Sequence, residues 1–161
     1  MNYNVKNEDA VLAVDFKPLK VSSSAFTEGG FIPSKYTCDG ENINPPLEIK
    51  GVPEETKCLA IVVEDPDAPI RSWQHWIAWN IHSVKHIKAG REMEAEGRND
   101  FGENKYSGPC PFSGAHHYYF KVYALDSLLD MPTTSTKREL EKSMSEHIIG
   151  FGQLSGVYER K

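Results

Sequence analysis

The chain has 161 residues, of which 39% are hydrophobic and 25% charged, a composition typical of a folded protein and not of a disordered one. This length predicts a single domain over residues 1–161, with a first segment, 1–20, whose structure the sequence leaves open. Lys and Arg number 18 and Asp and Glu number 23, so the net charge is −5, and no long basic run occurs. These values argue against nucleic acids and anionic membrane surfaces as partners.

The N-terminus and the cysteines indicate the cellular compartment. No stretch approaches the roughly 20 apolar residues of a membrane span, and residues 1–20 lack the apolar centre of a secretory signal, so we expect a cytoplasmic protein. Cys38, Cys58 and Cys110 are widely spaced and form no C-x-x-C, which argues against a zinc site or a disulfide framework. Reduced thiols are the preferred interpretation. One Cys38–Cys110 bridge is the alternative, because both residues lie in loop-like sequence.

The first part of the chain alternates short predicted strands with turn-rich segments. Residues 21–26 are β-like, residues 32–46 form a long loop rich in Pro, Gly, Asn and Asp, and residues 47–49 indicate a short strand. Residues 58–64 are a continuous apolar run rich in Ile and Val, which predicts a strand buried on both faces. This strand ends at residues 65–69, because their two prolines cannot continue a central strand.

The second part of the chain holds three more predicted strands. Residues 76–82 predict another buried strand, and residues 116–125 predict a strand dense in aromatic side chains. Between them, residues 88–108 carry glycines among charges and are interpreted as a long irregular excursion. Residues 153–159 predict a final strand.

One helix is predicted, over residues 136–147. Thr136 followed by Glu139 is a capping-box pattern, and apolar residues recur every four positions between 140 and 148. Gly150 is the expected C-terminal stop of this helix. Together the elements predict a mostly β domain with peripheral α structure.

Two groups of polar residues near the predicted strands 58–64 and 76–82 could carry chemistry. Asp65 and Asp67 lie on a stiff turn bracketed by prolines, which suits a binding rim but also a turn in which the carboxylates cap backbone amides. His75 precedes the strand 76–82. Strict alternation places its side chain on one face with those of Ile77, Trp79 and Ile81.

The strand over residues 116–125 follows a loop rich in Gly and Pro. Alternation places His116 and Tyr118 on one face and His117 and Tyr119 on the other, so the two histidines cannot share a metal ion through this strand. His116 and Tyr118 offer hydrogen-bond donors beside a loop that can expose backbone N–H groups, a combination that suits an oxyanion or phosphate. Packing of the tyrosines in the core is the alternative.

Several motifs follow one another along most of the chain. They are Asp65-Pro66-Asp67-Ala68-Pro69, Trp73-Gln74-His75-Trp76, Gly108-Pro109, Gly114-Ala115-His116-His117-Tyr118 and, earlier, Tyr36-Thr37-Cys38-Asp39-Gly40-Glu41-Asn42 with Pro45-Pro46-Leu47. With these motifs the chain resembles the phosphatidylethanolamine-binding protein family, and more closely its prokaryotic Raf-kinase-inhibitor-like branch. The resemblance implies a β-sandwich with a helix near the C-terminus and a small anion-binding pocket.

The resemblance also assigns roles to residues. Its pocket roles fall on Asp65, His75, His116 and Tyr118. Trp73, Gly108, Pro109 and Asp67 complete the expected ligand-binding set. A cis peptide is expected at Ala68–Pro69, because X–Pro bonds lower the cost of the cis form. A homodimer and a protein kinase or other protein partner are further implications of the resemblance.

We therefore expect a non-enzymatic protein that binds a phosphate or another small anionic group and modulates kinase signalling, without a cofactor or a metal. An Asp–His hydrogen bond is expected to fix the tautomer of one histidine. The first alternative is a hydrolase or transferase with His75 or His116 as general base and Asp65 as its orienting group. A nucleophilic Cys110, six residues before His116, belongs to that alternative. A metal site from Asp65, Asp67 and one histidine, and a purely structural role, are the others.

Overall fold

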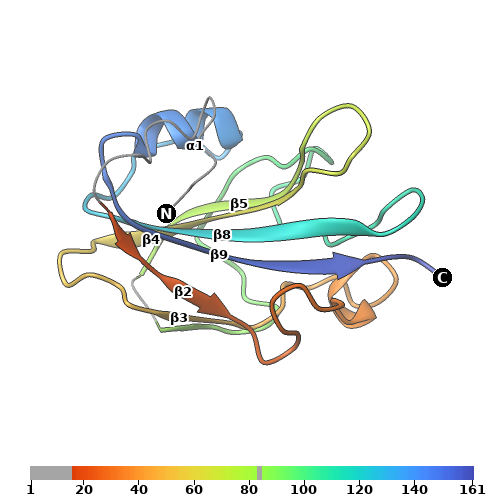
Figure 1. Cartoon of the computed structure of the whole chain (residues 1–161). Coiled ribbons are helices and arrows are strands. Elements are labelled where there is room, and N and C mark those ends of the chain that lie inside the picture. The colour runs from red at the N-terminus through yellow and green to blue at the C-terminus, as the bar shows by residue number, and fades with distance from the viewer. Residues whose placement is uncertain (1–15, 83–84) are drawn as a thin grey trace.

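The computed structural model describes residues 16–82 and 85–161 and consists of two sheets with one helix outside them (Figure 1). The larger sheet has the strand order β1-β9-β8-β4-β5-β7, and the smaller has the order β2-β3-β6. The strands are β1 (Lys17–Pro18), β2 (Lys20–Ser22), β3 (Leu47–Lys50), β4 (Cys58–Asp65), β5 (Trp73–Ile81), β6 (His86–Ile87), β7 (Ala95–Glu96), β8 (His116–Leu125) and β9 (Ile148–Tyr158). The helix is α1 (Lys137–Met144), and Ser34–Tyr36 forms one 3-10 turn.

The large sheet is buried on both faces along β4, as its apolar run predicts. Ile61 and Val63 belong to the core between the two sheets, whereas Ala60 and Val62 belong to a second core that includes Leu140 of α1. In Figure 1, α1 lies on the side of the large sheet opposite β2 and β3. The predicted mostly β fold with a helix near the C-terminus is therefore confirmed, and so are the strands predicted at 58–64 and 116–125.

The helix begins where the sequence predicts and ends earlier. The backbone N–H and the hydroxyl of Thr136 both donate to the Glu139 carboxylate, at 2.7 Å each. The helix ends at Met144, and the prediction of a stop at Gly150 is wrong, because residues from Ile148 onward pair with β8 as the strand β9. Pairing along β8 outweighs the local helical pattern here.

Two irregularities in β5 overturn the predicted face assignment of its side chains. Val63 of β4 pairs with Trp76 and Glu64 pairs with Gln74, so His75 is an extra residue, a β-bulge, between them. The bulge turns His75 to the face of Tyr118, and the two rings lie 5.4 Å apart at 88°.

The second irregularity lies near Asn80, whose φ is 53°. Ile77 and Trp79 pack in the core under α1, whereas Ile81 packs between the sheets. Strict alternation through both irregularities is therefore wrong, and His75 does not share a face with Ile77 and Trp79.

Two further expectations are corrected. Cys38 and Cys110 form a disulfide, so the expectation of three reduced thiols is wrong, and only Cys58 is free. No peptide bond in the described parts of the chain is cis, so the expected cis bond at Ala68–Pro69 is absent.

None of the helices in residues 16–82 and 85–161 is long and apolar enough to cross a membrane. Most of the uncertain segment 1–20 lies outside the described residues.

Candidate functional site

A small cavity of about 220 Å³ lies where β4 ends and β8 begins. The strands place it there: β4 runs antiparallel to both of its neighbours, β5 and β8, so the end of β4 meets the start of each. Its lining residues are Asp65, Ala68, Pro69, Trp73, His75, Phe101, Cys110, Pro111, Phe112, His116 and Tyr118. Five of the predicted ligand-binding residues, from three strands, thus surround one space.

Asp65 orients His116. The His116 Nδ1 lies 2.7 Å from Asp65 Oδ2, and the other carboxylate oxygen accepts the backbone N–H of Asp67 at 2.8 Å. Because a carboxylate can only accept, the Nδ1 of His116 carries the proton, and its Nε2 is a free acceptor when the ring is neutral. The expected Asp–His hydrogen bond is therefore present.

His75 is held in the same tautomer by a different partner. Its Nδ1 lies 2.6 Å from the backbone oxygen of Ser107, which again can only accept. Burial lowers the pKa of His75 from its ordinary 6.5, and the Ser107 carbonyl and the charge of Asp65 oppose this shift. His75 is therefore a neutral ring whose Nε2 is an acceptor.

A buried asparagine fixes the loop that orients His75. Asn99 donates to the backbone oxygens of His75 at 3.2 Å and Lys105 at 2.9 Å, and its own oxygen accepts the N–H groups of Phe101 and Glu103. These bonds give the irregular excursion a defined path beside β5. Sequence reasoning missed Asn99, because a single polar residue in an aperiodic segment has no pattern to mark it.

Tyr118 lines the same cavity and contacts both imidazole rings. Its ring lies 5.4 Å from that of His75 and 6.5 Å from that of His116. Burial raises the pKa of the Tyr118 hydroxyl, and the charge of Asp65 raises it further, so the group stays protonated. The hydroxyl lies near the Asp65 carboxylate and the Cys110 backbone, both of which affect its pKa, but it makes no hydrogen bond of good geometry within residues 16–82 and 85–161. A buried polar group without a partner is costly, and a ligand could provide the missing partner.

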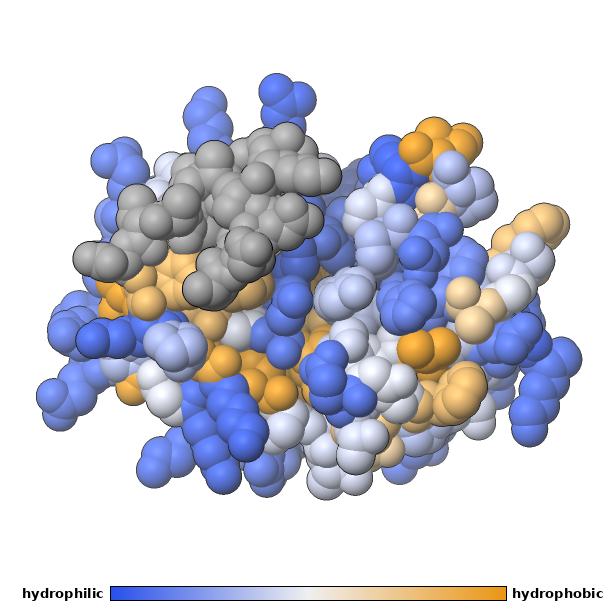
Figure 2. Space-filling model, in the orientation of Figure 1, coloured by the Kyte–Doolittle hydropathy of each residue, from blue (hydrophilic) through white to orange (hydrophobic). Residues whose placement is uncertain are grey.

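The mouth of the cavity is apolar. Phe112 is 93% exposed and Ile70, next to the lining residue Pro69, is 94% exposed. Figure 2 shows hydrophobic side chains projecting at the end of the molecule that carries the β4–β5 connection in Figure 1. Phe101 also lines the cavity and contacts the His75 ring, with centroids 5.2 Å apart. Neither phenylalanine was predicted, because both lie in loops without a periodic pattern.

Three predicted ligand-binding residues lie outside the cavity lining. Asp67 accepts the backbone N–H and the Nδ1 of His117, both at 2.8 Å, and this pair is exposed. Asp65 and Asp67 thus bind different histidines on opposite faces of β8, which confirms the predicted separation of His116 and His117. Among the described residues, no three His, Cys, Asp or Glu side chains are arranged to hold a metal ion.

Gly108 and Pro109 hold the loop in place instead of lining the cavity. The Gly108 N–H donates to Asn42 at 2.7 Å, and the Pro109 oxygen accepts the N–H of Cys38 at 3.1 Å. A Cβ atom at Gly108 would collide with the backbone oxygen of Tyr36, so only glycine permits this approach. Gly108 and Pro109 thus join their loop to the loop of Cys38 and Asn42. Both were predicted to lie at the rim of the pocket, but their contacts are structural.

The opposite face of the sheet carries an ion cluster directly behind the cavity. Glu64, next to Asp65 in β4, lies 2.7 Å from Lys121 and 2.8 Å from Lys137, and it accepts a hydrogen bond from Gln74 at 3.1 Å. Burial opposes ionisation, but the two lysines outweigh it and lower the pKa of Glu64 from 4.5 to about 2. This cluster ties α1 to the sheet.

Comparison with known proteins places the chain in a known family of β-sandwich proteins. The model of the family described as "Phosphatidylethanolamine-binding protein" matches residues 22–159, and the chain belongs to this family. A UPF0098 protein of Pyrococcus abyssi is 51% identical over 150 residues, which are 86% of this chain and 84% of the relative.

Two solved structures share the fold. A phosphatidylethanolamine-binding protein homologue of Chlamydia trachomatis is 40% identical, with a TM-score of 0.86 over 90% of this chain and 99% of that one. YbcL of E. coli, described as a new member of the mammalian family, is 31% identical, with a TM-score of 0.82 over 89% of this chain and 99% of that one. The resemblance inferred from the motifs is thus confirmed, and with family membership comes a ligand-binding role.

Proposed function

We propose that the cavity binds a phosphate group or a similar protic oxyanion together with one proton. The observation that carries this proposal is the fixed tautomer of both histidines, whose Nδ1 protons are engaged by Asp65 and Ser107. In the neutral site the Tyr118 hydroxyl is a donor and the two Nε2 atoms are acceptors. A fully ionised phosphate offers only acceptors, so it fits only when a proton is added.

Two equivalent placements of that proton satisfy the site. A monoprotonated phosphate ester donates its P–OH to one Nε2 and accepts from Tyr118, or the imidazole takes the proton and donates to the anion. The Asp65 carboxylate contacts the His116 ring at 2.7 Å, whereas burial lowers the pKa of His75 and disfavours its protonation. We therefore assign the bound proton to the space between His116 and the ligand. A few charge-assisted bonds to so small a ligand support roughly micromolar to millimolar affinity.

The proposed activity is binding without turnover. Neither Ser nor Thr is among the residues that line the cavity, and the lining cysteine, Cys110, is held in a disulfide. The Nε2 atoms could accept protons as general bases, but the lining of the oxidised cavity holds no Ser, Thr or free Cys for them to activate. Modulation of a kinase would follow if the phosphoryl group belongs to a partner protein. This role, the homodimer and the cytoplasmic location stay predictions.

Calorimetric titration with phenyl phosphate tests the proposal. Because one proton is taken up, affinity should fall as pH rises through the neutral range, approaching roughly tenfold per pH unit. His116→Ala should weaken binding by about 1–3 kcal/mol, the scale of a charge-assisted hydrogen bond. Heats that do not depend on the ionisation enthalpy of the buffer would contradict proton uptake. Release of phenol above background, abolished by His116→Ala, would favour a hydrolase instead.

A further inference from the structure

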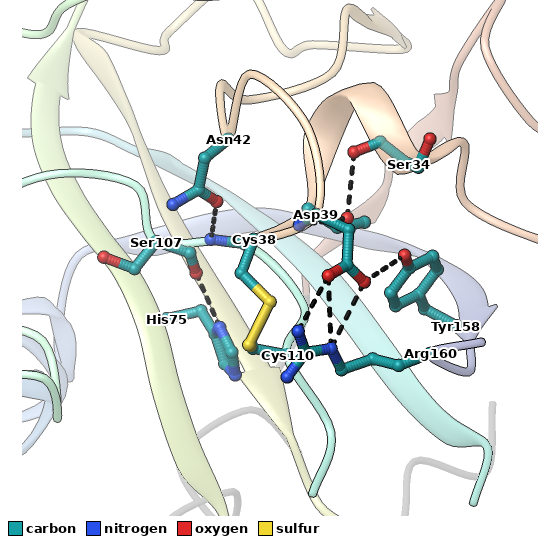
Figure 3. The surroundings of a disulfide bond; sticks show 11 residues. Ser34, Cys38, Asp39, Asn42, His75, Ser107, Cys110, Tyr158 and Arg160 are labelled. Carbon is teal, nitrogen blue, oxygen red and sulfur yellow. Dashed lines mark hydrogen bonds and ion pairs between the residues drawn. A yellow bond between two sulfur atoms is a disulfide. The ribbon is translucent and has the colours of Figure 1, made fainter.

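The disulfide forms part of the wall of the cavity. Cys110 is among the lining residues, whereas Cys38 is not, although their Cα atoms lie only 5.5 Å apart. Figure 3 draws the bridge between the two loops, with His75 and Ser107 in its surroundings. Both cysteines are partly exposed, so a small reductant can reach the bond.

The two loops are also joined by bonds that do not depend on the disulfide. These are Tyr106 Oη to the Tyr36 oxygen at 2.8 Å, the Gly108 N–H to Asn42 at 2.7 Å and the Cys38 N–H to the Pro109 oxygen at 3.1 Å. On the far side of the same loop, Asp39 accepts from Tyr158 at 2.6 Å and from Arg160 at 2.9 Å. Reduction therefore leaves Cys110, with its freed sulfur, among the residues that line the cavity.

The surroundings of that sulfur suit a reactive thiol. An ordinary cysteine has a pKa of about 8.5, and a nearby imidazole that accepts its proton favours the thiolate. His75 and His116, whose Nε2 atoms are such acceptors in the tautomers described above, line the same cavity of about 220 Å³ as Cys110. The buried Tyr118 hydroxyl, unpartnered among the described residues, is a further independent sign that this space receives a ligand.

We propose that the Cys38–Cys110 bridge masks a reactive thiol, and that reduction releases Cys110 as a nucleophile for small soft electrophiles that enter the cavity. A dithiol supplies two electrons and two protons, becomes a cyclic disulfide and leaves two protein thiols. The Cys110 thiol gives its proton to an imidazole Nε2. The thiolate then attacks the electrophile: with an alkyl halide, a carbon–sulfur bond forms as the carbon–halogen bond breaks and halide leaves.

The wild-type protein, reduced with a dithiol that is then removed, tests the proposal under brief exposure to iodoacetamide. Mass spectrometry of the peptides compares the three cysteines in one molecule. At pH 7, Cys110 should be alkylated about tenfold faster than Cys38, which corresponds to about one unit of pKa. Its rate should reach half its maximum below about pH 8.5. A rate equal to or below that of Cys38 overturns the proposal, and buried Cys58 serves as a foldedness control.

Two matched variants test the disulfide and the reactivity of Cys110 independently. Cys38→Ser should expose Cys110 to iodoacetamide without any reductant, whereas Cys110→Ser should leave Cys38 with the rate of an ordinary thiol. Inorganic phosphate should slow alkylation of Cys110 but not of Cys38 if the anion occupies the same cavity. Fast alkylation of Cys110 that phosphate does not slow would support the masked thiol but contradict anion binding in the cavity. The experiment therefore tests the two proposals independently.

Discussion

Glu64 and Asp65 are neighbours in β4, yet their carboxylates serve opposite faces of the sheet in opposite ways. Glu64 lies between two lysines and a glutamine, with its side chain 8% exposed. Asp65 has no lysine or arginine among its bonded partners in the described residues, and it holds His116 and the N–H of Asp67. On the face of Glu64, a buried negative charge is thus neutralised by lysines. On the face of Asp65, hydrogen-bond donors and acceptors remain available to a ligand.

Two adjacent residues of β4 thus have different roles: Glu64 contributes to stability, and Asp65 contributes to the proposed binding site. The ion cluster of Glu64 ties α1 and β8 to β4. The cavity beside Asp65 instead keeps an unpartnered hydroxyl on Tyr118, a cost that a ligand can offset. Substitutions of these two adjacent residues should therefore have very different effects.

The largest effect should come from Glu64→Gln. Removing the carboxylate takes away the ion-pair partner of Lys121 and one partner of Lys137, which keeps Glu141 at 3.5 Å; with the Lys121 charge left nearly buried, the loss should cost about 3–5 kcal/mol of unfolding free energy. Denaturant unfolding measures this value, with Asp65→Asn as the matched control of equal size. An equal or larger loss in the control would break the comparison.

Acid should reveal the same cluster without a substitution. The pKa of Glu64 is lowered from 4.5 to about 2, so its contribution is present above pH 4.5 and is lost as the pH falls toward 2. The shift corresponds to about 3 kcal/mol. The Glu64→Gln variant should lack this portion of the acid profile. Parallel profiles for wild type and variant would show that other carboxylates dominate acid unfolding.

Asp65→Asn should act mainly on binding. The amide can still contact His116 Nδ1, but the hydrogen bond loses its charged acceptor, so phenyl phosphate should bind about 1–3 kcal/mol more weakly. Titration calorimetry at pH 6 measures the loss. Unchanged affinity would mean that the proton of the complex does not reside at His116.

Thr136→Ala should test whether the helix cap supports the ion cluster of Glu64. Thr136 caps α1 immediately before Lys137, so losing its hydroxyl should cost about 1 kcal/mol and loosen the helix end that holds Glu64. The effect should shrink in the Glu64→Gln background, because the two residues support one contact. Strict additivity in this double-mutant cycle would show that they act independently.

His117→Ala should have the smallest effect on binding. Its ring lies outside the cavity, paired with exposed Asp67, so phenyl phosphate affinity should stay within about 0.5 kcal/mol of wild type. His116→Ala, one residue earlier, is the contrasting variant. Equal losses from both would contradict the assignment of the two faces of β8.

Regular strands were predictable from the sequence, and irregular ones were not. The alternation along 116–125 placed His116 and Tyr118 correctly, because β8 pairs without interruption over this part of its length. The bulge at His75 depends on register with β4, which no local pattern reveals. The sequence therefore predicts the members of the site better than the way in which His75 reaches it.

The remaining wall of the site depends on contacts between distant loops. Phe101 reaches the cavity because Asn99 fixes the path of its loop, and Cys110 because two loops meet across 72 residues of sequence. Composition favoured reduced cysteines, since it carries no information on how close two loops come in space. Only the three-dimensional structure shows that Cys110 belongs to the cavity wall.

The strand order also bears on how quickly a working cavity forms during refolding. β4 and β5 are neighbours in sequence and can pair as a hairpin, whereas β8 must return across more than fifty residues to reach β4. Closing such a loop costs entropy before its contacts form, so this pairing should be slow relative to the hairpin. Asp65 and His75 come from the hairpin, and His116 and Tyr118 come from β8. The cavity should therefore form late in refolding, when β8 pairs with the β4–β5 hairpin. The contact between the rings of His75 and Tyr118 should form in that step.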